Sequence, residues 1–364
     1  MTRTTATNFT APLQFPYATA GTDVFMKEDV QVLAQAVDQH NHTSGKGLPM
    51  AAGSIPNGTI TSAMIADGTI ATADLANAAV TNAKLGTDTA RLNLLTNGGF
   101  EVWQRGNGPF SGNVMSADRW AAGLAGTDTL SVSRAAGIAG QAGQYAAVGT
   151  FTLGTGGGNS AYYQHLTKAD GNALNGKTLS FSVWVNASAG AVRAYIGSDG
   201  TGGTTSPSAA NTGGIQLLTQ TYTVPADFTR VDVGLLLNGS FTIDNAMLVV
   251  GSVAADYAPL HPADDLARCL RYYEIHGEAA NSMNVTLYGQ AGGVMQMPLY
   301  YKAMKPVTPT VTKNGTWAVV NCAQPGLSAP GLSECMLFTT ITALGQLQFA
   351  NSGAGQNITI EANP

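Results

Sequence analysis

The chain has 364 residues, enough for two or three domains, and only 11% of them are charged, with a formal net charge of -5. This balance excludes the basic surface that nucleic-acid-binding proteins need, so we expect no nucleic-acid partner. Glycine is heavily used, with 44 residues, and short apolar runs alternate with Gly, Ser, Thr, Ala and Asn. Such a composition is typical of a mainly β protein with many short strands and turns.

The sequence carries no signal for a membrane or for secretion. It has no apolar stretch long enough to span a membrane, and residues 1–20 lack the apolar run of a secretory signal. Its three cysteines, Cys269, Cys322 and Cys335, are an odd number in a long chain and are expected to be buried thiols rather than a disulfide framework. We therefore expect the protein to be made in a cytoplasm, with no membrane span.

Residues 1–50 are predicted to form an N-terminal segment with one short helix. Apolar residues recur near helical spacing between Val24 and Gln39, with charged residues in the first turns. The helix is followed by a glycine-closed loop that contains His40 and His42.

Residues 51–92 are predicted to form a stalk, because the sequence repeats every ten residues and carries an apolar residue at every fifth position. These positions are Ile55, Ile60, Ile65, Ile70, Leu75, Val80 and Leu85. The period fits neither an α-helix nor a β-strand, and Asn57-Gly58 and Asp67-Gly68 predict turns. One apolar residue in five cannot build a core for one chain, so we expect three identical chains to cover one another's stripe. A flexible linker is the alternative, which the strict repeat disfavours.

The loop that contains His40 and His42 has two interpretations. Residues two apart in an extended loop point the same way, so three chains on one axis would bring six imidazoles together, enough for a transition-metal site. In the other interpretation the two histidines lie in an exposed loop and cap the C-terminal end of the preceding helix.

Residues 93–260 are predicted to form an antiparallel β-sandwich. The segment from Leu179 to Asn186 alternates, which places Leu179, Phe181, Val183 and Val185 on one face of a strand. Trp184 falls on the opposite face among polar residues, where an aromatic ring can stack on a sugar ring. Tyr162 and Tyr163 are further candidates for carbohydrate binding. The alternative for Trp184 is packing in a trimer interface or under a loop.

Residues 261–364 are predicted to begin with a short helix and to continue as a second β domain. The helix starts at Pro262, carries acidic residues in its first turn and runs to Tyr273. Leu266, Cys269 and Leu270 are expected to share one face of it with Tyr273. Short strand patterns then recur to the end of the chain.

Three motifs carry a resemblance. Asn-Gly-Gly-Phe-Glu-Val-Trp-Gln-Arg-Gly at 97–106, Ala-Asp-Arg-Trp at 117–120 and Leu-Ala-Arg-Cys-Leu-Arg-Tyr-Tyr-Glu at 266–274 resemble the tail-fibre and receptor-binding proteins of tailed bacteriophages. The stalk repeat and the His-Asn-His loop are similar to the same class, some of whose long fibres bind iron through His-x-His pairs. The resemblance implies a homotrimeric virion fibre whose N-terminus docks on other virion proteins and whose β domains meet host-surface polysaccharide. It does not distinguish a fibre on the tail of the virion from one on the capsid.

A second resemblance concerns the two ends of the predicted sandwich. Residues 97–101 and 241–248 are similar to jelly-roll carbohydrate-binding modules, in which the acids matching Glu101 and Asp244 help to hold a structural calcium ion. This chain has Asn245 where those modules often carry a second aspartate. The alternative is that the first and last strands pair without a metal.

The sequence therefore leaves three functional hypotheses. The first is a non-enzymatic adhesin that recognises host glycan through many weak contacts, with no catalytic residues and no required cofactor. The second is a structural head or capsid fibre or decoration protein without a ligand of its own. The third is a glycan depolymerase, which the absence of a long β-helix repeat from residues 93–364 disfavours.

Overall fold

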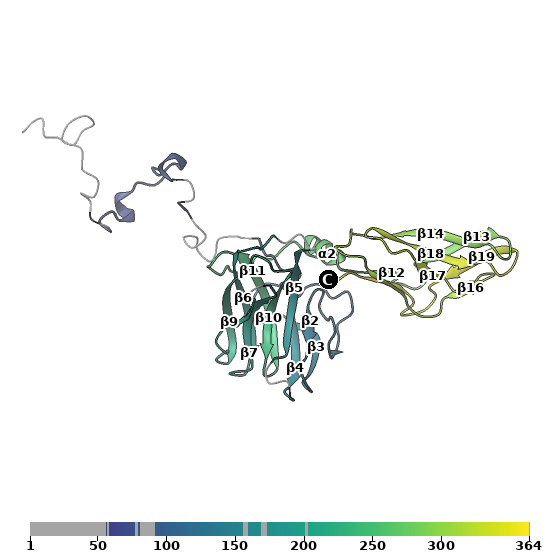
Figure 1. Ribbon diagram of the computed structural model, residues 1–364, viewed down its shortest axis with the longest axis horizontal. Coiled ribbons are helices and arrows are strands. Elements are labelled where there is room, and N and C mark those ends of the chain that lie inside the picture. The colour runs from purple at the N-terminus through teal and green to yellow at the C-terminus, as the bar shows by residue number, and fades with distance from the viewer. Residues whose placement is uncertain are drawn as a thin grey trace, which may run out of the picture. The chain divides into compact units, whose positions relative to one another are not determined.

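The structure, a computed structural model, describes residues 56, 58–76, 79–80, 92–155, 159–168, 173–200 and 203–363 (Figure 1). The chain divides into two compact units, Met1–Ala76 and Asn77–Pro364. The predicted helix between Val24 and Gln39, His40, His42 and the two ends of the apolar stripe, Ile55 and Leu85, lie outside the described residues.

The ten-residue repeat folds into a repeated turn. Two short 3-10 helices, η1 (Ser62–Met64) and η2 (Thr72–Asp74), lie ten residues apart. Between them the backbone N–H and the hydroxyl of Thr69 both donate to the carbonyl of Ala66, at 3.2 and 2.6 Å. Gly68 has φ +76°, a conformation that glycine adopts without strain, so the turn predicted at Asp67-Gly68 is confirmed.

The apolar residues of the repeat are exposed in the single chain. Ile60 and Ile70 are 51% and 54% exposed, Ile65 and Leu75 are 40% and 46% exposed, and Val80 is 54% exposed. Large aliphatic side chains at a regular spacing thus remain uncovered by the described part of one chain.

Residues 110–250 form a sandwich of two antiparallel sheets (Figure 1). The six-stranded sheet has the order β1-β3-β4-β11-β6-β9 and the five-stranded sheet the order β2-β5-β10-β7-β8. The strands are β1 (Phe110–Ser111), β2 (Ala121–Gly123), β3 (Thr129–Ala136), β4 (Tyr145–Thr152), β5 (Ala161–Thr167), β6 (Thr178–Ala187), β7 (Val192–Ser198), β8 (Thr205–Pro207), β9 (Gly214–Thr223), β10 (Arg230–Leu237) and β11 (Phe241–Val250). The predicted mainly β fold with an antiparallel sandwich is confirmed.

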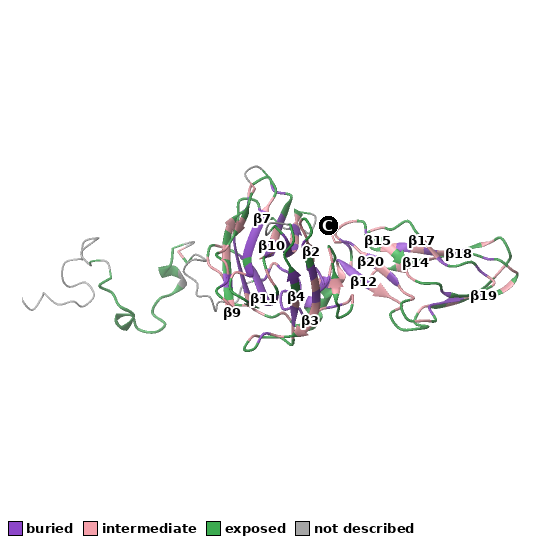
Figure 2. Ribbon diagram, turned by 90° about the horizontal axis from the view of Figure 1, so that it is seen from below, coloured by how far each residue is buried: buried purple, intermediate pink, exposed green. Residues whose placement is uncertain are grey.

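The sandwich core lies between the two sheets, where Figure 2 shows buried residues along the inner strands. Leu179, Phe181, Val183 and Val185 of β6 are fully buried in it, as the alternation predicted. Trp184 lies on the other face of the same strand and is half-buried. The first segment of the sandwich pairs with its last strand, since Leu94 N donates to the carbonyl of Leu248 at 2.9 Å.

The helix α2 (Pro262–Leu270) follows the sandwich. His261 caps its start, because Ala263 N donates to His261 Nδ1 at 3.2 Å. The predicted apolar face is wrong in two respects. The helix ends at Leu270, so Tyr273 lies in the strand β12 (Tyr273–His276) and not on the helix. Leu266 is 40% exposed, whereas Asp265 is 6% exposed. Asp265 turns inward because its carboxylate accepts a hydrogen bond of 2.9 Å from the backbone N–H of Asn97.

The residues after α2 form three antiparallel sheets of three strands each in the described chain, ordered β12-β20-β15, β13-β19-β16 and β14-β18-β17. Their strands are β12 (Tyr273–His276), β13 (Asn284–Gly289), β14 (Val294–Tyr300), β15 (Thr310–Lys313), β16 (Ala318–Val320), β17 (Gly326–Ser328), β18 (Glu334–Thr340), β19 (Gly345–Ala350) and β20 (Ile358–Glu361). A core separate from that of the sandwich includes Trp317, Leu337 and Phe349.

The three cysteines, Cys269, Cys322 and Cys335, are free and buried, as predicted. Within the described ranges, no helix is both long enough and apolar enough to cross a membrane.

Candidate functional site

A groove of about 600 Å³ opens on the outer face of the five-stranded sheet. Its lining residues are Asn113, Val114, Met115, Ala121, Ala122, Gly123, Leu124, Ala125, Asn159, Ala161, Tyr163, Tyr195 and Asp232. Of its two aromatic rings, Tyr163 is half-buried and Tyr195 is only 5% exposed. The accessible part of the Tyr163 ring and a few polar groups, on an otherwise small and apolar surface, make a shape that accepts a small or extended polar ligand.

Strand register brings the two tyrosines of the groove into one row. Tyr163 of β5 and Tyr195 of β7 both pair with Gly234 of β10, which lies between them. Gly234 has to be glycine, because a Cβ there would lie 2.1 Å from the carbonyl oxygen of Tyr162 and 2.9 Å from Cβ of Tyr163. The glycine therefore keeps the sheet surface between the two tyrosines free of a side chain.

A charged cluster borders this row. Asp232, two residues before Gly234, pairs with His165, and the Nδ1 of His165 lies 2.5 Å from Oδ1 of Asp232. Arg230 Nε lies 3.2 Å from the same oxygen, and the His165 ring meets the Tyr163 ring edge-on at 4.6 Å. The carboxylate is thus held by two partners, and the orientation of the Tyr163 ring is fixed by the histidine.

The two tyrosine hydroxyls stay protonated at neutral pH. Burial raises the pKa of Tyr163, and the nearby carboxylate of Asp232 adds to the shift. Burial also raises the pKa of Tyr195 well above its ordinary value. Both phenols therefore remain neutral donors and acceptors, which suits uncharged hydroxyl-rich ligands.

The structure separates the three residues predicted to bind carbohydrate. Tyr163 lies on the groove, but Tyr162 is fully buried, and its hydroxyl lies 2.8 Å from Ser116 Oγ. The prediction for Tyr162 is wrong, because its ring packs between Trp120 and Phe241 in the core and cannot reach a sugar. Trp184 lies on β6 of the other sheet, away from the groove.

Sequence reasoning missed Tyr195, Asp232 and His165. Each lies on a strand with alternating burial. Because His165 follows Tyr163 by two residues, the sequence alone could have predicted that both lie on the same face of β5. No sequence signal set the register that brings β10 and β7 alongside.

Glu101 and Asp244, predicted from the ends of the sandwich, lie close to a common pair of glycines. A Cβ on Gly143 would lie 2.5 Å from Oε1 of Glu101, and one on Gly137 would lie 3.4 Å from both Oδ2 of Asp244 and the carbonyl oxygen of Gly143. Glu101 Oε1 accepts hydrogen bonds from Gln144 N at 2.6 Å and Tyr145 N at 3.1 Å. The loop 137–145 thus wraps around both carboxylates.

Asp244 is fully buried, and its environment favours the protonated form. Burial raises its pKa to about 7, and the charge of Glu101 adds to the rise, while hydrogen bonds from the backbone N–H groups of Ile138 and Asn245 oppose it. The neighbouring Asn245 is 3% exposed, and its Oδ1 has no hydrogen-bond partner among the described residues. The half-buried Glu101, the buried Asp244 and the unpartnered amide oxygen of the next residue, Asn245, are oxygen donors of the kind that calcium prefers. No described group of three or more His, Cys, Asp and Glu side chains gathers here, so Asn245 and backbone carbonyls would have to complete the shell.

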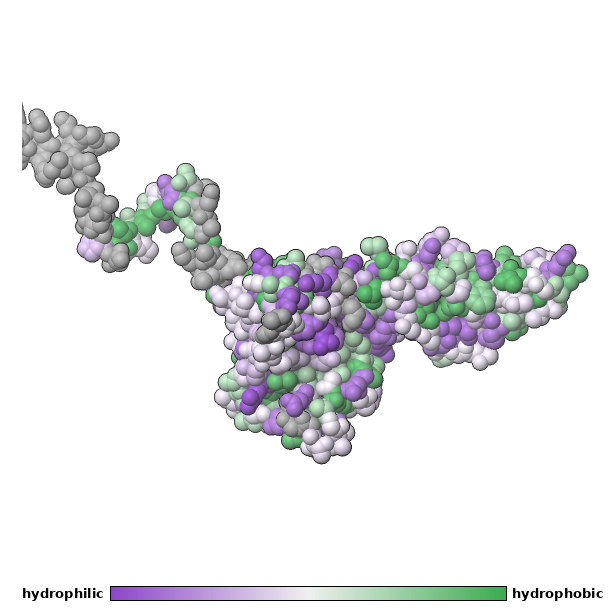
Figure 3. All heavy atoms as spheres, in the orientation of Figure 1, coloured by the Kyte–Doolittle hydropathy of each residue, from purple (hydrophilic) through white to green (hydrophobic). Residues whose placement is uncertain are grey.

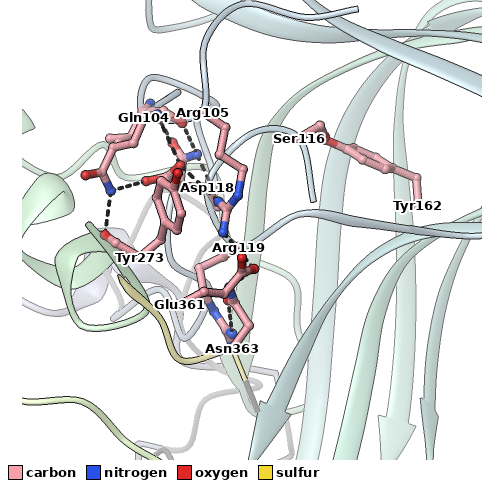
Figure 4. Close-up of polar contacts among 11 residues, drawn as sticks. Gln104, Arg105, Ser116, Asp118, Arg119, Tyr162, Tyr273, Glu361 and Asn363 are labelled. Atoms are coloured by element: carbon pink, nitrogen blue, oxygen red, sulfur yellow. Dashed lines mark hydrogen bonds and ion pairs between the residues drawn. The ribbon is translucent and has the colours of Figure 1, made fainter. Parts of the chain in front are cut away.

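The motifs that carry the resemblance meet where the sandwich joins the last β strands (Figure 4). The guanidinium of Arg105 lies over the ring of Tyr273, and that of Arg119 lies over the ring of Tyr272, both at 3.7 Å. Arg105 also forms an ion pair of 2.9 Å with Glu361. The two arginines are therefore structural and connect the sandwich to the C-terminal residues.

Asp118 is the buried acid of this junction. It is 1% exposed, accepts a hydrogen bond of 2.5 Å from Gln104 Nε2 and lies 3.5 Å from Arg105 Nη1. Burial raises its pKa to about 6, although Gln104 and Arg105 oppose the shift. Removing Arg105 would leave this carboxylate without its cation.

We expect Arg105→Leu to lower the free energy of unfolding by about 2 kcal/mol, since a buried charged group loses its partner. The loss should be larger at pH 8 than at pH 5, because the uncompensated Asp118 is ionised only at the higher pH. Thermal unfolding at both pH values measures it. Arg134→Leu is the matched control, because Arg134 stacks on Tyr145 at 4.0 Å without a buried acid. Equal losses in the two variants at both pH values would contradict this account.

Comparisons with known proteins gave structural neighbours only. No family model matches the sequence, and no curated protein matches it. Among solved structures, the chain is similar to the enzymatically active domain of tailspike protein 4 of bacteriophage CBA120, at 15% identity and a TM-score of 0.31, over 44% of this chain and 21% of that one. It is also similar to a xylan-binding domain of carbohydrate-binding module family 22, at 22% identity and a TM-score of 0.31, over 38% and 91% of the two chains. The C-terminal family 22 module of Clostridium thermocellum Xyn10B matches at 19% identity and a TM-score of 0.30, over 43% and 98%.

Proposed function

We propose that this chain is a homotrimeric fibre of a tailed-bacteriophage virion, on the tail or the capsid, that binds host-surface polysaccharide through its sandwich. The observation that carries the binding role is the groove with Tyr163 and Tyr195 on one row and Asp232 beside them. Aromatic faces stack on the apolar faces of sugar rings, and the carboxylate and phenols exchange hydrogen bonds with sugar hydroxyls.

The trimer and the virion position have separate support. The exposed apolar stripe of the stalk repeat supports a trimer, because one chain leaves it uncovered. The sequence motifs shared with phage fibre proteins support the virion assignment. On this proposal residues 1–50 dock on other virion proteins, and His40 and His42 either hold a transition metal on the trimer axis or cap the helix before them.

We propose binding without catalysis. Asp232 is the only carboxylate among the described residues that line the groove. Glycoside hydrolysis generally needs two carboxyl groups placed on either side of the bond to be cleaved. The groove therefore supports an adhesin better than a depolymerase.

We further propose that Glu101 and Asp244 hold a structural calcium ion with the help of Asn245 Oδ1. Bound there, calcium would neutralise the two carboxylates and fix the loop 137–145 against β11. Its role in this proposal is to stabilise the sandwich, and the adhesin needs no cofactor for chemistry.

Tyr163→Ala should weaken glycan binding by about tenfold per site, because it removes the more accessible ring of the row. The measurement is binding of the full-length protein to an array of bacterial surface polysaccharides, followed by titration of the best ligand. Trp184→Ala is the matched control, an aromatic truncation on the opposite sheet.

The outcomes separate the candidate functions. Binding lost in Trp184→Ala and kept in Tyr163→Ala would place the glycan on the six-stranded sheet and contradict the groove. No binding of the native protein to any host polysaccharide would favour the purely structural fibre. Release of reducing ends from a bound polysaccharide would favour the depolymerase.

A further inference from the structure

A second hollow, of about 640 Å³, adjoins the groove. It is lined by residues of and around β1, by residues 113–115 and by Glu361 of β20. Residues 113–115 also line the groove, so the two cavities meet along this segment. Each volume falls within the range of about 300 to 1,000 Å³ that pockets for small ligands occupy.

The segment 113–115 that separates the two cavities is fixed to the edge of the five-stranded sheet. Ala122 N of β2 donates to the carbonyl of Val114 at 3.1 Å. Leu124 N donates to Oδ1 of Asn113 at 2.6 Å. The side chain of Val114 is 40% exposed, so a ligand that lies across the segment would contact an apolar group there. The boundary is therefore a firm surface over which one ligand can pass from the groove into the second hollow.

The second hollow offers the same kinds of contact as the groove. The half-buried ring of Phe110 stacks on the ring of Trp103, with 6.4 Å between their centroids, and the exposed Ser111 follows Phe110 in β1. Figure 3 shows hydrophobic and hydrophilic residues interspersed over the sandwich, so hydropathy alone does not distinguish the hollow. An aromatic ring beside hydroxyl and amide groups in a concave surface suits a sugar residue.

The charges of the second hollow favour an uncharged ligand. The guanidinium of Arg105 lies 2.9 Å from Glu361 Oε1 and 3.5 Å from Asp118 Oδ1, so its charge is already balanced (Figure 4). The side chain of Glu361 is 44% exposed and would repel an acidic sugar. Among the described residues, Glu361 lines the second hollow only and Asp232 the groove only, so neither cavity contains a pair of carboxylates.

We infer that the second hollow is a further subsite of the proposed binding site, and that the site takes an extended, uncharged polysaccharide chain that crosses residues 113–115. The inference rests on the proposed function, because the groove supplies the other subsite. A chain that occupies both cavities gains contacts in the second without a second loss of translational freedom. Because Glu361 belongs to the C-terminal β domain, both the sandwich and that domain contribute to the complete site.

Binding of fragments of different length to the full-length protein tests the inference. The probe is the polysaccharide that binds best on the array, partially hydrolysed and separated into short and long fragments. Ser111→Trp should fill the second hollow and weaken the binding of long fragments about tenfold, while short fragments bind as before. Tyr163→Ala should weaken both. Thr219→Trp is the matched control, because Thr219 is exposed on β9, at the opposite edge of the six-stranded sheet from β1.

A smaller substitution gives an independent readout. A bound long fragment should slow the reaction of Ser111→Cys with a thiol reagent and leave that of Thr219→Cys unchanged. The native cysteines are buried and give a low background. Unchanged labelling of Ser111→Cys in the presence of long fragments would overturn the inference, even if Ser111→Trp failed to fold.

The remaining outcomes separate this inference from the proposed function. If Ser111→Trp binds long fragments as tightly as the native protein does and Tyr163→Ala does not, the second subsite is wrong and the groove stands. If the native protein binds no polysaccharide, the proposed function is wrong and this inference falls with it. A best ligand that is acidic would contradict the uncharged chain.

Discussion

Ile70→Asp is expected to dissociate the protein into monomers or to lower its melting temperature sharply. Ile70 is 54% exposed in one chain and lies in the stalk repeat. In the proposed trimer, Ile60, Ile70 and Val80 face the three-fold axis, so the substitution would gather three carboxylates at one level. Burial of three unpaired charges costs on the order of 10 kcal/mol, more than a stalk of short repeats can offset.

Sedimentation or light scattering measures the mass, and thermal unfolding measures the stability. Thr61→Asp is the matched control, because it adds the same charge at an exposed residue of the repeat that is not in the apolar stripe. A trimeric mass and an unchanged melting temperature for Ile70→Asp would show that the stalk does not hold the chains together.

Calcium is expected to raise the melting temperature of the protein, and a chelator is expected to lower it. At a free calcium concentration 100 times the dissociation constant, the folded state gains about 2.7 kcal/mol. The gain should fall strongly in Asp244→Asn, because the site then keeps only one of its two carboxylates and loses half of the negative charge that attracts calcium. Elemental analysis of the purified protein gives an independent count of bound calcium. No chelator response together with no calcium in the elemental analysis would contradict the site.

The calcium effect should grow with pH. Without calcium, the folded-state pKa of Asp244 is about 7, above its ordinary value. The protonated carboxyl group therefore contributes to the free energy of unfolding, and this contribution is fully present below about pH 4. That stability is lost as the pH rises through about 7. Calcium displaces the proton, so the difference in melting temperature between calcium and chelator should increase from pH 5 to pH 8.

The test compares the melting temperature with calcium and with chelator at each pH, and does not rely on the pH dependence of one sample. The reason is that the raised pKa values of Asp118 and Asp265 contribute a pH dependence of stability with the same sign. That contribution is common to calcium and chelator and cancels in the comparison. A calcium effect that is as large at pH 5 as at pH 8 would show that Asp244 is not a ligand.

The periodicity of the sequence predicted local structure well. The alternation along β6 identified four residues that are fully buried in the core, and the glycines of the stalk repeat identified a turn. These features depend on neighbours in the chain, which a sequence displays directly. The helix α2 shows the limit: its start was predicted from Pro262 and the acids, but its buried side includes Asp265 because Asn97, far away in the chain, donates to it.

The candidate groove could be predicted only in part. Tyr162 and Tyr163 are consecutive in a strand, so one of them had to face the core and the other the outside. The two residues alone do not determine which of them faces the core, because that depends on the register of β5 against β10. The same register brings Tyr195 and Asp232 to Tyr163 across a glycine.

By itself, the sequence determined the mainly β class, the strand alternation, the repeated turn of the stalk and the stripe of apolar residues along it, because each is a local period. Only the tertiary structure decided which tyrosine lines the groove, that Arg105 and Arg119 stack on Tyr273 and Tyr272, and that Glu101 and Asp244 lie around one loop. Those arrangements join residues that lie far apart in the sequence. They follow from how whole strands pair and pack, and no local pattern records that choice.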